Sequence, residues 1–296
     1  MKTLVIGYGI QGKKRHNFLK EDYAGIVDPA LTEAGYKSIE SVPLNSFDAA
    51  LVCTPDENKY EIVAYLLKHN KHVLLEKPFI FSLEQYEKLK GLNKNCVCYT
   101  AYNHRFEPHF KRMKEVIDSG MLGKIYTCRM FYGNGTALDV GLSPWRDRGY
   151  GVVHDLGSHL LDTVLFWFGE EISSFTLDHR HCFENKAPDH AILVSNGSPF
   201  IELEMTLLSW RNTFSCTILA ENGSAHIDSL CKWGPSTFTL RKRIRPSGYP
   251  KEEAQIFVQN DPTWEDEYKY FKHLCLNSPG WNNLKNDQWI QSNLPH

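Results

Sequence analysis

The chain has 296 residues, of which 42% are hydrophobic and 23% are charged, and its formal net charge is −2. This length suits one large domain or two ordinary ones, and the near-neutral charge argues against a nucleic-acid or acidic-membrane partner. No run approaches the roughly 18 apolar residues of a membrane span, and no cleavage site follows the first apolar stretch. With eight scattered cysteines and no C-x-x-C pair, we expect a cytoplasmic protein.

The first third of the chain alternates short apolar runs with amphipathic stretches. The runs expected as strands are residues 2–7, 23–28, 48–54, 71–76 and 96–101. The stretches expected as helices are residues 12–20, 58–70 and 82–93. Short apolar strands separated by helices predict a doubly wound parallel sheet that is covered on both faces, of α/β class.

The rest of the chain has a different texture. Residues 107–124 read as a helix that ends at Gly120 or Gly123 and leads out of the first domain. Strand-like alternation then dominates, with hairpin signals at residues 196–197 and 222–223 and closing helices at 264–275 and 286–294. The prediction is a dinucleotide-binding domain over residues 1–118 and an α+β domain over residues 119–296, with a large, open, mainly antiparallel sheet.

A glycine-rich loop follows the first expected strand. Its G-x-G-x-x-G spacing after a strand and before a helix is typical of the Rossmann fold. The first glycine permits a tight turn, the second lets a pyrophosphate approach, and the third allows close packing. The residues expected around the phosphates are Gly7, Gly9, Ile10, Gln11 and Gly12. The alternative is a plain glycine turn.

Asp28 ends the second expected strand, 19 residues after Gly9. A carboxylate accepts hydrogen bonds from a ribose diol and repels a 2′-phosphate, which favours NAD over NADP. Lys13 and Arg15 lie close in sequence and would soften that preference. The alternative is a turn residue before Pro29.

Further along the chain, several motifs resemble the Gfo/Idh/MocA family of oxidoreductases. They are "GYGIQG", "VCTPDENKYEIVAYLLKHNKHVLLEKP", "YNHRF" and "DLGSHLLD" after a "PWR" loop, and together they span nearly the whole chain. The resemblance implies a Rossmann domain followed by a domain with a large open sheet. It also implies a nicotinamide cofactor, hydride transfer at a carbinol carbon, and a homodimer or homotetramer.

The same resemblance assigns roles to single residues. It implies catalytic roles for Lys77, Asp155 and His159, and it places Thr54 and Pro55 beside the nicotinamide. Glu76, next to Lys77, is expected on the cofactor side. A histidine that is common in the family shortly after Thr-Pro is absent, and "DENKY" stands in its place.

The chemistry can also be argued from the residue types. Oxidising an alcohol needs a hydride acceptor and a base, and the imidazole of His159 suits that base. Lys77 can hold the reacting oxygen and stabilise a developing alkoxide, while Asp155, four residues before His159, can orient the imidazole. Because Lys77 lies in the first domain and the pair in the second, we expect them to meet in a cleft between the domains.

Five further residues are expected to contact the substrate: Tyr102, Asn103, Arg105, Trp145 and Arg146. Tryptophan offers a stacking face to a sugar ring, and arginine can bind a carboxylate or phosphate through two hydrogen bonds. The alternatives are packing for Trp145 and an ion pair for Arg146.

The sequence therefore predicts an NAD(P)-dependent dehydrogenase that acts on a sugar, with a nucleotide-linked or acidic sugar as the narrower expectation. The alternatives are a polyol or inositol-type dehydrogenase and a catalytically silent NAD-binding regulator. A metal-dependent hydrolase built on His154, Asp155 and His159 is disfavoured, because no third converging ligand is apparent, and no metal is expected.

Overall fold

The computed structural model describes residues 1–143, 146–172 and 174–294, which form two compact units. The first unit contains Met1–Asn103 together with Thr263–Gln291, and the second contains His104–Pro262 together with the described residues after Gln291. These units differ from the predicted division at residue 118, since the chain returns to its first unit after leaving the second. Among the described residues, no helix has the length and apolar character that a membrane crossing requires.

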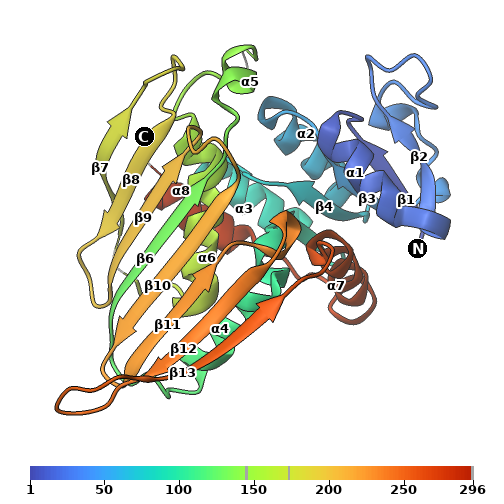
Figure 1. Cartoon of the computed structure of the whole chain (residues 1–296). Coiled ribbons are helices and arrows are strands. Elements are labelled where there is room, and N and C mark those ends of the chain that lie inside the picture. Colours follow the sequence, from blue (N-terminus) through green and yellow to red (C-terminus); the bar gives the residue numbers. More distant parts are fainter. Residues whose placement is uncertain (144–145, 173, 295–296) are drawn as a thin grey trace. The chain divides into compact units, whose positions relative to one another are not determined.

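The first unit is built on a parallel sheet of five strands among the described residues, in the order β2-β1-β3-β4-β5. The strands are β1 (Thr3–Ile6), β2 (Tyr23–Val27), β3 (Ala49–Val52), β4 (His72–Glu76) and β5 (Cys98–Ala101). The helices between them are α1 (Ile10–Leu19), α2 (Asp56–Lys68) and α3 (Leu83–Leu92). All five strands and all three helices lie where their sequence patterns predict them (Figure 1).

Both faces of this sheet are buried, which explains the unbroken apolar runs. Leu4 and Ile6 of β1 pack with side chains of α2 and α3 on one face, while Val5 packs on the opposite face. Such strands cannot alternate polar and apolar residues, because neighbouring side chains point to opposite faces and both are covered.

The closing helices cover the five-stranded sheet, which explains why the chain returns to the first unit. Helix α7 (Thr263–Asn277) contributes Tyr268, Phe271 and Leu274 to the cluster around Val5. Helix α8 (Leu284–Asn293) contributes Leu284 to the opposite cluster. Burying such side chains stabilises a fold by about 2 kcal/mol each, so the closing helices belong to the first unit although they come last in the chain.

The second unit contains a mixed sheet of eight strands among the described residues, in the order β13-β12-β11-β10-β6-β9-β8-β7. They are β6 (Ile125–Gly133), β7 (Thr176–His181), β8 (His190–Ser195), β9 (Phe200–Thr206), β10 (Thr213–Ala220), β11 (Gly223–Asp228), β12 (Ser236–Lys242) and β13 (Lys251–Phe257). Neighbours pair antiparallel except β6 and β9, which are parallel, so the predicted open antiparallel sheet is confirmed in its main character.

The edge strand β13 has no counterpart in the sequence prediction. Its "KEEAQIF" segment is almost wholly exposed, so it carries no apolar alternation. Its backbone pairs antiparallel with β12, from Lys242–Lys251 to Ser236–Phe257. Two exposed ion pairs at 2.7 Å, Arg241–Glu252 and Lys242–Glu253, add to that pairing. Arg241 and Lys242 are thus the exposed end of β12.

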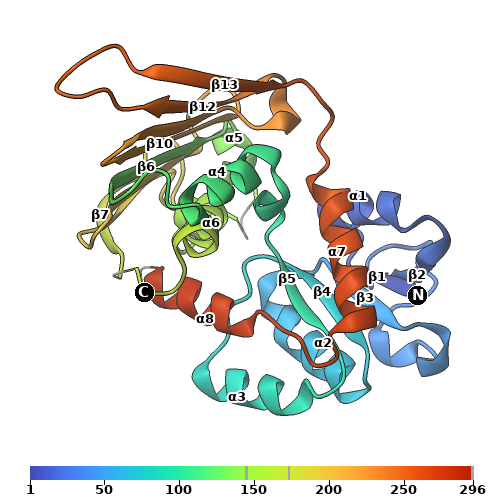
Figure 2. The same ribbon diagram turned by 90° about the horizontal axis from the view of Figure 1, so that it is seen from below.

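Two helices cover one face of this second sheet, α4 (Pro108–Asp118) and α6 (Ser158–Phe168), as Figure 2 shows. Phe110 of α4, Trp167 of α6 and Phe214 of β10 meet in the core, and the Trp167 indole donates to the Phe110 carbonyl at 3.0 Å. Helix α4 ends as predicted, because Gly120 adopts the left-handed φ of +67° that terminates helices. A short helix α5 (Ala137–Gly141) follows β6.

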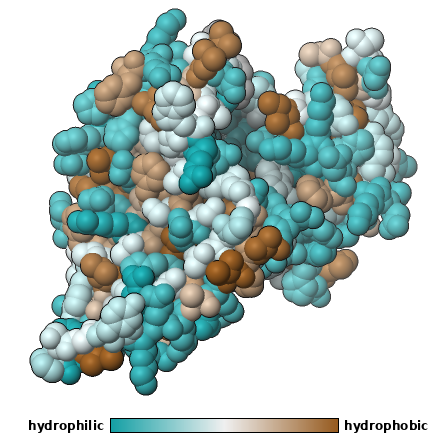
Figure 3. Space-filling view, viewed as in Figure 1, coloured by the Kyte–Doolittle hydropathy of each residue, from teal (hydrophilic) through white to brown (hydrophobic). Residues whose placement is uncertain are grey.

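The opposite face of the eight-stranded sheet bears half-exposed side chains. Along β6, Cys128, Met130 and Tyr132 are buried, whereas Arg129 is exposed and Phe131 is half-buried. In the space-filling view, polar and apolar side chains intermingle over these strands (Figure 3). Such a mixed surface neither forms a second core nor is fully hydrophilic.

Candidate functional site

The glycine loop after β1 leaves no room for side chains at two of its three glycines. Gly7 has a φ of +85°, and a Cβ there would lie 2.8 Å from the carbonyl oxygen of Cys53. A Cβ on Gly12 would lie 2.0 Å from the carbonyl oxygen of Gly7. At Gly9, by contrast, a Cβ would meet nothing within 4 Å. Gly9 therefore opens toward space at the start of α1, where the first N–H groups of a helix attract phosphates.

Asp28 holds this loop in place. Its carboxylate accepts hydrogen bonds from the backbone N–H groups of Tyr8 (2.7 Å), Ala30 (2.8 Å) and Leu31 (3.0 Å). Although partial burial opposes it, these three donors keep the pKa of Asp28 below its ordinary value. The turn role expected as the alternative is therefore present, and a ribose contact by the same carboxylate stays a prediction.

Thr54 follows β3 at the same sheet edge. Its Oγ1 is buried and makes no hydrogen bond to the residues that the structure describes. A buried hydroxyl without a partner is costly, so a bound group that hydrogen bonds it would be stabilised there. Together with the open position at Gly9, this hydroxyl shows that the carboxyl edge of the sheet fits a dinucleotide.

Arg15 connects the glycine-loop helix to Glu76, the residue before Lys77. Its guanidinium is 2% exposed and lies 2.7 Å from Glu76, 2.7 Å from Glu267 of α7, and over the ring of Trp264. Burial opposes protonation, yet the two carboxylates raise the pKa of Arg15 above its ordinary value. Burial also raises the pKa of Glu267 to about 7.

This network corrects the expectation that Arg15 softens the preference for NAD. Because the guanidinium is buried between carboxylates, it is committed to holding α1, β4 and α7 together. It also gives Glu76 a structural partner directly before Lys77, and a cofactor contact by Glu76 stays a prediction.

Lys77 begins the turn after β4, and it is half-buried. The turn is held by Lys59 of α2, which is 2% exposed and whose ammonium donates to the Pro78 carbonyl at 2.7 Å. The same ammonium lies 2.7 Å from Asp56. Lys59 belongs to the "DENKY" segment that departs from the family pattern, so the departure supplies a buried cation that fixes the Lys77 turn.

Replacing Lys59 by Met should slow turnover without weakening NADH binding. The methionine keeps the apolar stem but leaves the Pro78 carbonyl without its donor, so Lys77 becomes less well placed. Lys77 is predicted to hold the reacting oxygen, and misplacement of such a group costs rate steeply, so we expect a fall in kcat of about tenfold. Steady-state kinetics and NADH fluorescence titration measure the two quantities. Lys68→Met, an exposed change on the same helix, is the control, and an unchanged kcat in Lys59→Met would contradict this role.

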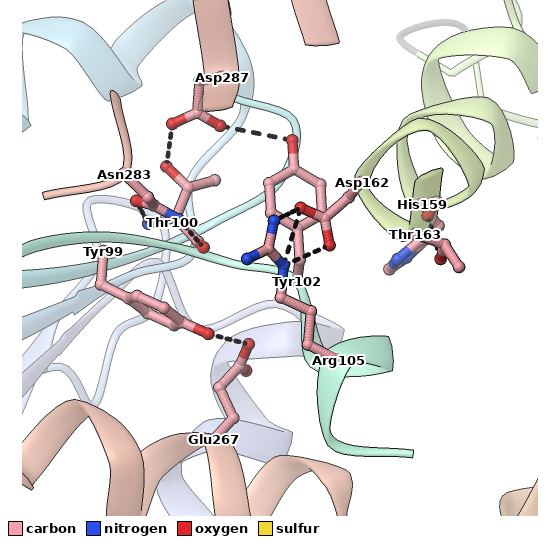
Figure 4. Close-up of polar contacts among 10 residues, drawn as sticks. All are labelled: Tyr99, Thr100, Tyr102, Arg105, His159, Asp162, Thr163, Glu267, Asn283 and Asp287. Carbon is pink, nitrogen blue, oxygen red and sulfur yellow. Dashed lines mark hydrogen bonds and ion pairs between the residues drawn. The ribbon is translucent and has the colours of Figure 1, made fainter. Parts of the chain in front are cut away.

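Tyr102 and Asn103, expected to contact substrate, are bound within the first unit. The Tyr102 hydroxyl lies 3.4 Å from Asp287, whose other oxygen accepts from Thr100 at 2.6 Å (Figure 4). The Asn103 amide donates to Thr263 at 2.8 Å. These contacts tie the end of β5 to the closing helices, which is the packing role of the motif.

In the second unit, Asp155 and His159 lie on one continuous helical segment. Val153–Gly157 forms a widened π-helical turn that leads directly into α6, which contains His159. Gly157 lets this turn pack closely on β9, because a Cβ there would lie 2.9 Å from the sulfur of Met205, which would have to move. Single π-helical turns are frequent at functional sites.

Arginine side chains accompany both carboxylates of this segment. Arg146 lies 3.5 Å from Asp155, so the ion pair expected as the alternative is present. Arg105 makes a two-pronged contact to the buried Asp162, with distances of 2.6 to 3.1 Å (Figure 4). Although Arg105 opposes it, burial raises the pKa of Asp162. Trp145 lies outside the described residues.

His104, in the "YNHRF" motif, is a neighbour of His159 that sequence reasoning missed. Its ring stacks on the His159 ring with 4.1 Å between centroids and 18° between planes. The Lys232 ammonium lies 3.4 Å from Nε2 of His104. His104 is visible in the motif, but nothing in the sequence indicates that it contacts His159 and Lys232, which lie 55 and 128 positions later.

Among the described residues, no group of three or more His, Cys, Asp or Glu side chains is arranged to hold a metal ion. The second unit instead offers the imidazole of His159 and the carboxylate of Asp155 on one helical segment. The first unit offers Lys77 at the sheet edge that carries the glycine loop.

Two family descriptions match the chain. Residues 1–104 match "Oxidoreductase family, NAD-binding Rossmann fold", and residues 110–226 match "GFO/IDH/MocA C-terminal domain". A curated relative, myo-inositol 2-dehydrogenase of Thermotoga maritima, is 30% identical over 136 residues, which are 44% of this chain and 39% of the relative. The aligned region spans 35% to 52% of the length of the first three curated relatives.

Solved structures share the fold of the whole chain. A levoglucosan dehydrogenase in complex with NADH has a TM-score of 0.81 at 16% identity, covering 98% of this chain and 94% of that one. The UDP-N-acetylglucosamine 3-dehydrogenase GnnA from Acidithiobacillus ferrooxidans has a TM-score of 0.78 at 17% identity, covering 99% and 96%. At these identities the likeness concerns the fold.

Proposed function

Because the chain belongs to the GFO/IDH/MocA family of oxidoreductases, with its NAD-binding Rossmann fold, we propose that it is an NAD-dependent dehydrogenase acting on a CH–OH group of a sugar or polyol. The observation that supports this most directly is the carboxyl edge of the first sheet. There a glycine loop open at Gly9, the unpartnered hydroxyl of Thr54 and the Lys77 turn follow neighbouring strands.

The nicotinamide, when bound, supplies the hydride acceptor or donor. In this proposal Lys77 holds the substrate oxygen and stabilises the negative charge that develops on it. His159 accepts the hydroxyl proton, and Asp155 contacts the substrate or orients the imidazole. The N–H groups at the start of α1 bind the phosphates, and Asp28 offers its remaining acceptor capacity to the ribose, which supports NAD over NADP.

The ion pairs of Arg105 and Arg146 bear on the charge of the substrate. An anionic or nucleotide-linked sugar was expected from Arg105 and Arg146, yet each already has a carboxylate partner. That pairing lowers the positive charge left for an anionic ligand. We therefore propose a neutral sugar or polyol first, and a nucleotide-linked sugar second.

The test is oxidation of a substrate panel by the purified chain with NAD, followed by absorbance of the reduced nicotinamide. The panel contains neutral monosaccharides, inositols, sugar acids and nucleotide-linked sugars. Turnover of the neutral members is the expected result, and turnover restricted to the charged members would overturn the substrate assignment. Tight NADH binding with no turnover of any member would contradict the dehydrogenase and favour a silent NAD-binding regulator.

The half-exposed face of the eight-stranded sheet supports a further proposal, that copies of this chain associate there as a homodimer or homotetramer. Phe131, Ile192, Val194 and Phe200 are half-buried on β6, β8 and β9, and they alternate with buried residues. Light scattering on the purified chain measures its oligomeric state, and a monomer at micromolar concentration would overturn the proposed association.

A further inference from the structure

His104 and His159 form a stacked pair inside the second unit. His104 is 2% exposed, and besides the stack on His159 its ring contacts Phe110 at 5.7 Å and Tyr132 at 5.4 Å between centroids. The four rings come from three elements and the turn Asn103–Phe106. The His159 ring therefore packs against the rings of His104 and Tyr132, with His104 in closest contact.

Lys232 contacts the His104 ring. Its ammonium lies 3.4 Å from Nε2 of His104 and 4.7 Å from the ring centroid of Trp233. A lysine ammonium donates hydrogen bonds and accepts none, so in this contact Nε2 of His104 is the acceptor when Lys232 is charged. A second positive charge on His104 would face Lys232 at this distance, so the charge on Lys232 disfavours protonation of His104.

The segment that bears Lys232 is anchored. Cys231 donates to the two carboxylate oxygens of Glu107, from its backbone N–H at 3.0 Å and from its thiol at 2.9 Å. Burial lowers the pKa of Lys232, while the charges of Asp261 and Glu107 counteract that effect. The ammonium is thus held close to His104 by a fixed backbone.

We propose that His104 and Lys232 are positioning residues for His159: His104 fixes the plane of its ring, and the Lys232 charge keeps both imidazoles neutral. The catalytic consequence rests on the proposed function, because a neutral His159 is the form that can accept a proton from a hydroxyl group. The effect on the His159 ring itself does not depend on that function.

The other charged groups that face His159 within this unit do not replace Lys232. Asp155 and His154 precede it on the same segment, and Asp155 is paired with Arg146. Asp162, one turn later, is paired with Arg105. Tyr132 faces the ring at 6.2 Å between centroids. Lys232 also has carboxylates near it, Asp261 and Glu107, but its ammonium lies 3.4 Å from Nε2 of the ring that stacks on His159.

The experiment is an NMR titration of the His159 imidazole in the purified chain, with the resonance assigned by its loss in His159→Gln. In Lys232→Met the aliphatic stem remains and the charge is removed. We expect the pKa of His159 to rise by about 1 unit, as for loss of one charge at short range. The acidic limb of the kcat/KM profile should move to higher pH by the same amount, since it reports a base that must be deprotonated.

Three variants make the result specific. Lys111→Met removes a charge that lies over Phe106 in the same unit, and it should leave the His159 titration unchanged. Lys232→Arg keeps the charge and should restore the parent titration, and Lys232→Gln is the neutral replacement if the methionine variant does not fold. His104→Ala should lower kcat by about tenfold, because the ring loses its stacking partner.

A His159 pKa in Lys232→Met or Lys232→Gln that stays within about 0.2 unit of the parent would overturn the inference, even if the chain turns over sugars. If instead no substrate is oxidised but the titration shifts as expected, the positioning role stands and the dehydrogenase proposal fails. The two proposals therefore fail on different measurements.

Discussion

Replacing Lys77 by Ala should abolish turnover while leaving NADH binding intact. The ammonium is the group that we assign to the reacting oxygen, and removing a preorganised charge at a developing oxyanion typically costs about 10³-fold in kcat. NADH affinity should stay within about twofold, because the glycine loop and Thr54 do not depend on the Lys77 side chain. Stopped-flow absorbance measures the first quantity and fluorescence titration the second.

The matched control for Lys77→Ala is Lys94→Ala, an exposed change in the same unit just before β5, which should leave both quantities as they are. Lys77→Arg keeps a positive charge but moves it and changes its shape, so it should recover only part of the rate. Turnover of Lys77→Ala within about tenfold of the parent would remove this lysine from the chemistry.

The second large effect is expected at the glycine loop, where changes at Gly12 and Gly9 should separate an effect on folding from an effect on NADH binding. Gly12→Ala places a Cβ 2.0 Å from the Gly7 carbonyl oxygen, so the loop or α1 must shift. We expect a loss of about 3 kcal/mol in the free energy of unfolding together with loss of NADH binding. Gly9→Ala meets no protein atom, so its stability should fall by no more than about 1 kcal/mol, the cost of a weaker N-cap.

NADH affinity of Gly9→Ala should nevertheless drop at least about tenfold, because the new methyl group occupies the approach to the pyrophosphate. Gly91→Ala, in α3 and also without neighbours within 4 Å, is the control and should gain about 0.5 to 1 kcal/mol while binding NADH normally. Thermal unfolding and fluorescence titration give both quantities for each variant. Undiminished binding in Gly9→Ala would show that the phosphates lie elsewhere.

The first unit was largely readable from the sequence because its signals are local. Buried parallel strands such as β3 (Ala49–Val52) are continuous apolar runs, and a G-x-G-x-x-G loop is defined by neighbours in the chain. The large open sheet was readable from alternation for the same reason. Strand β13 was not predicted because it pairs with β12 through its backbone and buries almost none of its side chains, so it has no apolar alternation.

The partners of the candidate site were not readable, because they are distant in sequence. The sequence suggests that Arg15 softens the preference for NAD, but Glu267, 252 positions away, pairs with it in the core. In the sequence, Lys59 is only part of the segment that departs from the family pattern. In the structure, its ammonium donates to the Pro78 carbonyl and holds the Lys77 turn. In each case the residue type is visible in the chain, and only the tertiary fold decides which charge it meets.

The return of α7 to the first sheet has a consequence for how the chain acquires its cofactor-binding unit during synthesis. Residues 1–103 leave the ribosome first, yet the face around Val5 stays bare, and the Arg15 guanidinium has one carboxylate in place of two, until Thr263–Gln291 has been made. Domains usually assemble in the order in which they emerge. Here the eight described strands of the second unit, which end at Phe257, are all made before α7, so a chain stalled at that point would have every strand of the open sheet while its nucleotide-binding unit still lacked α7 and α8.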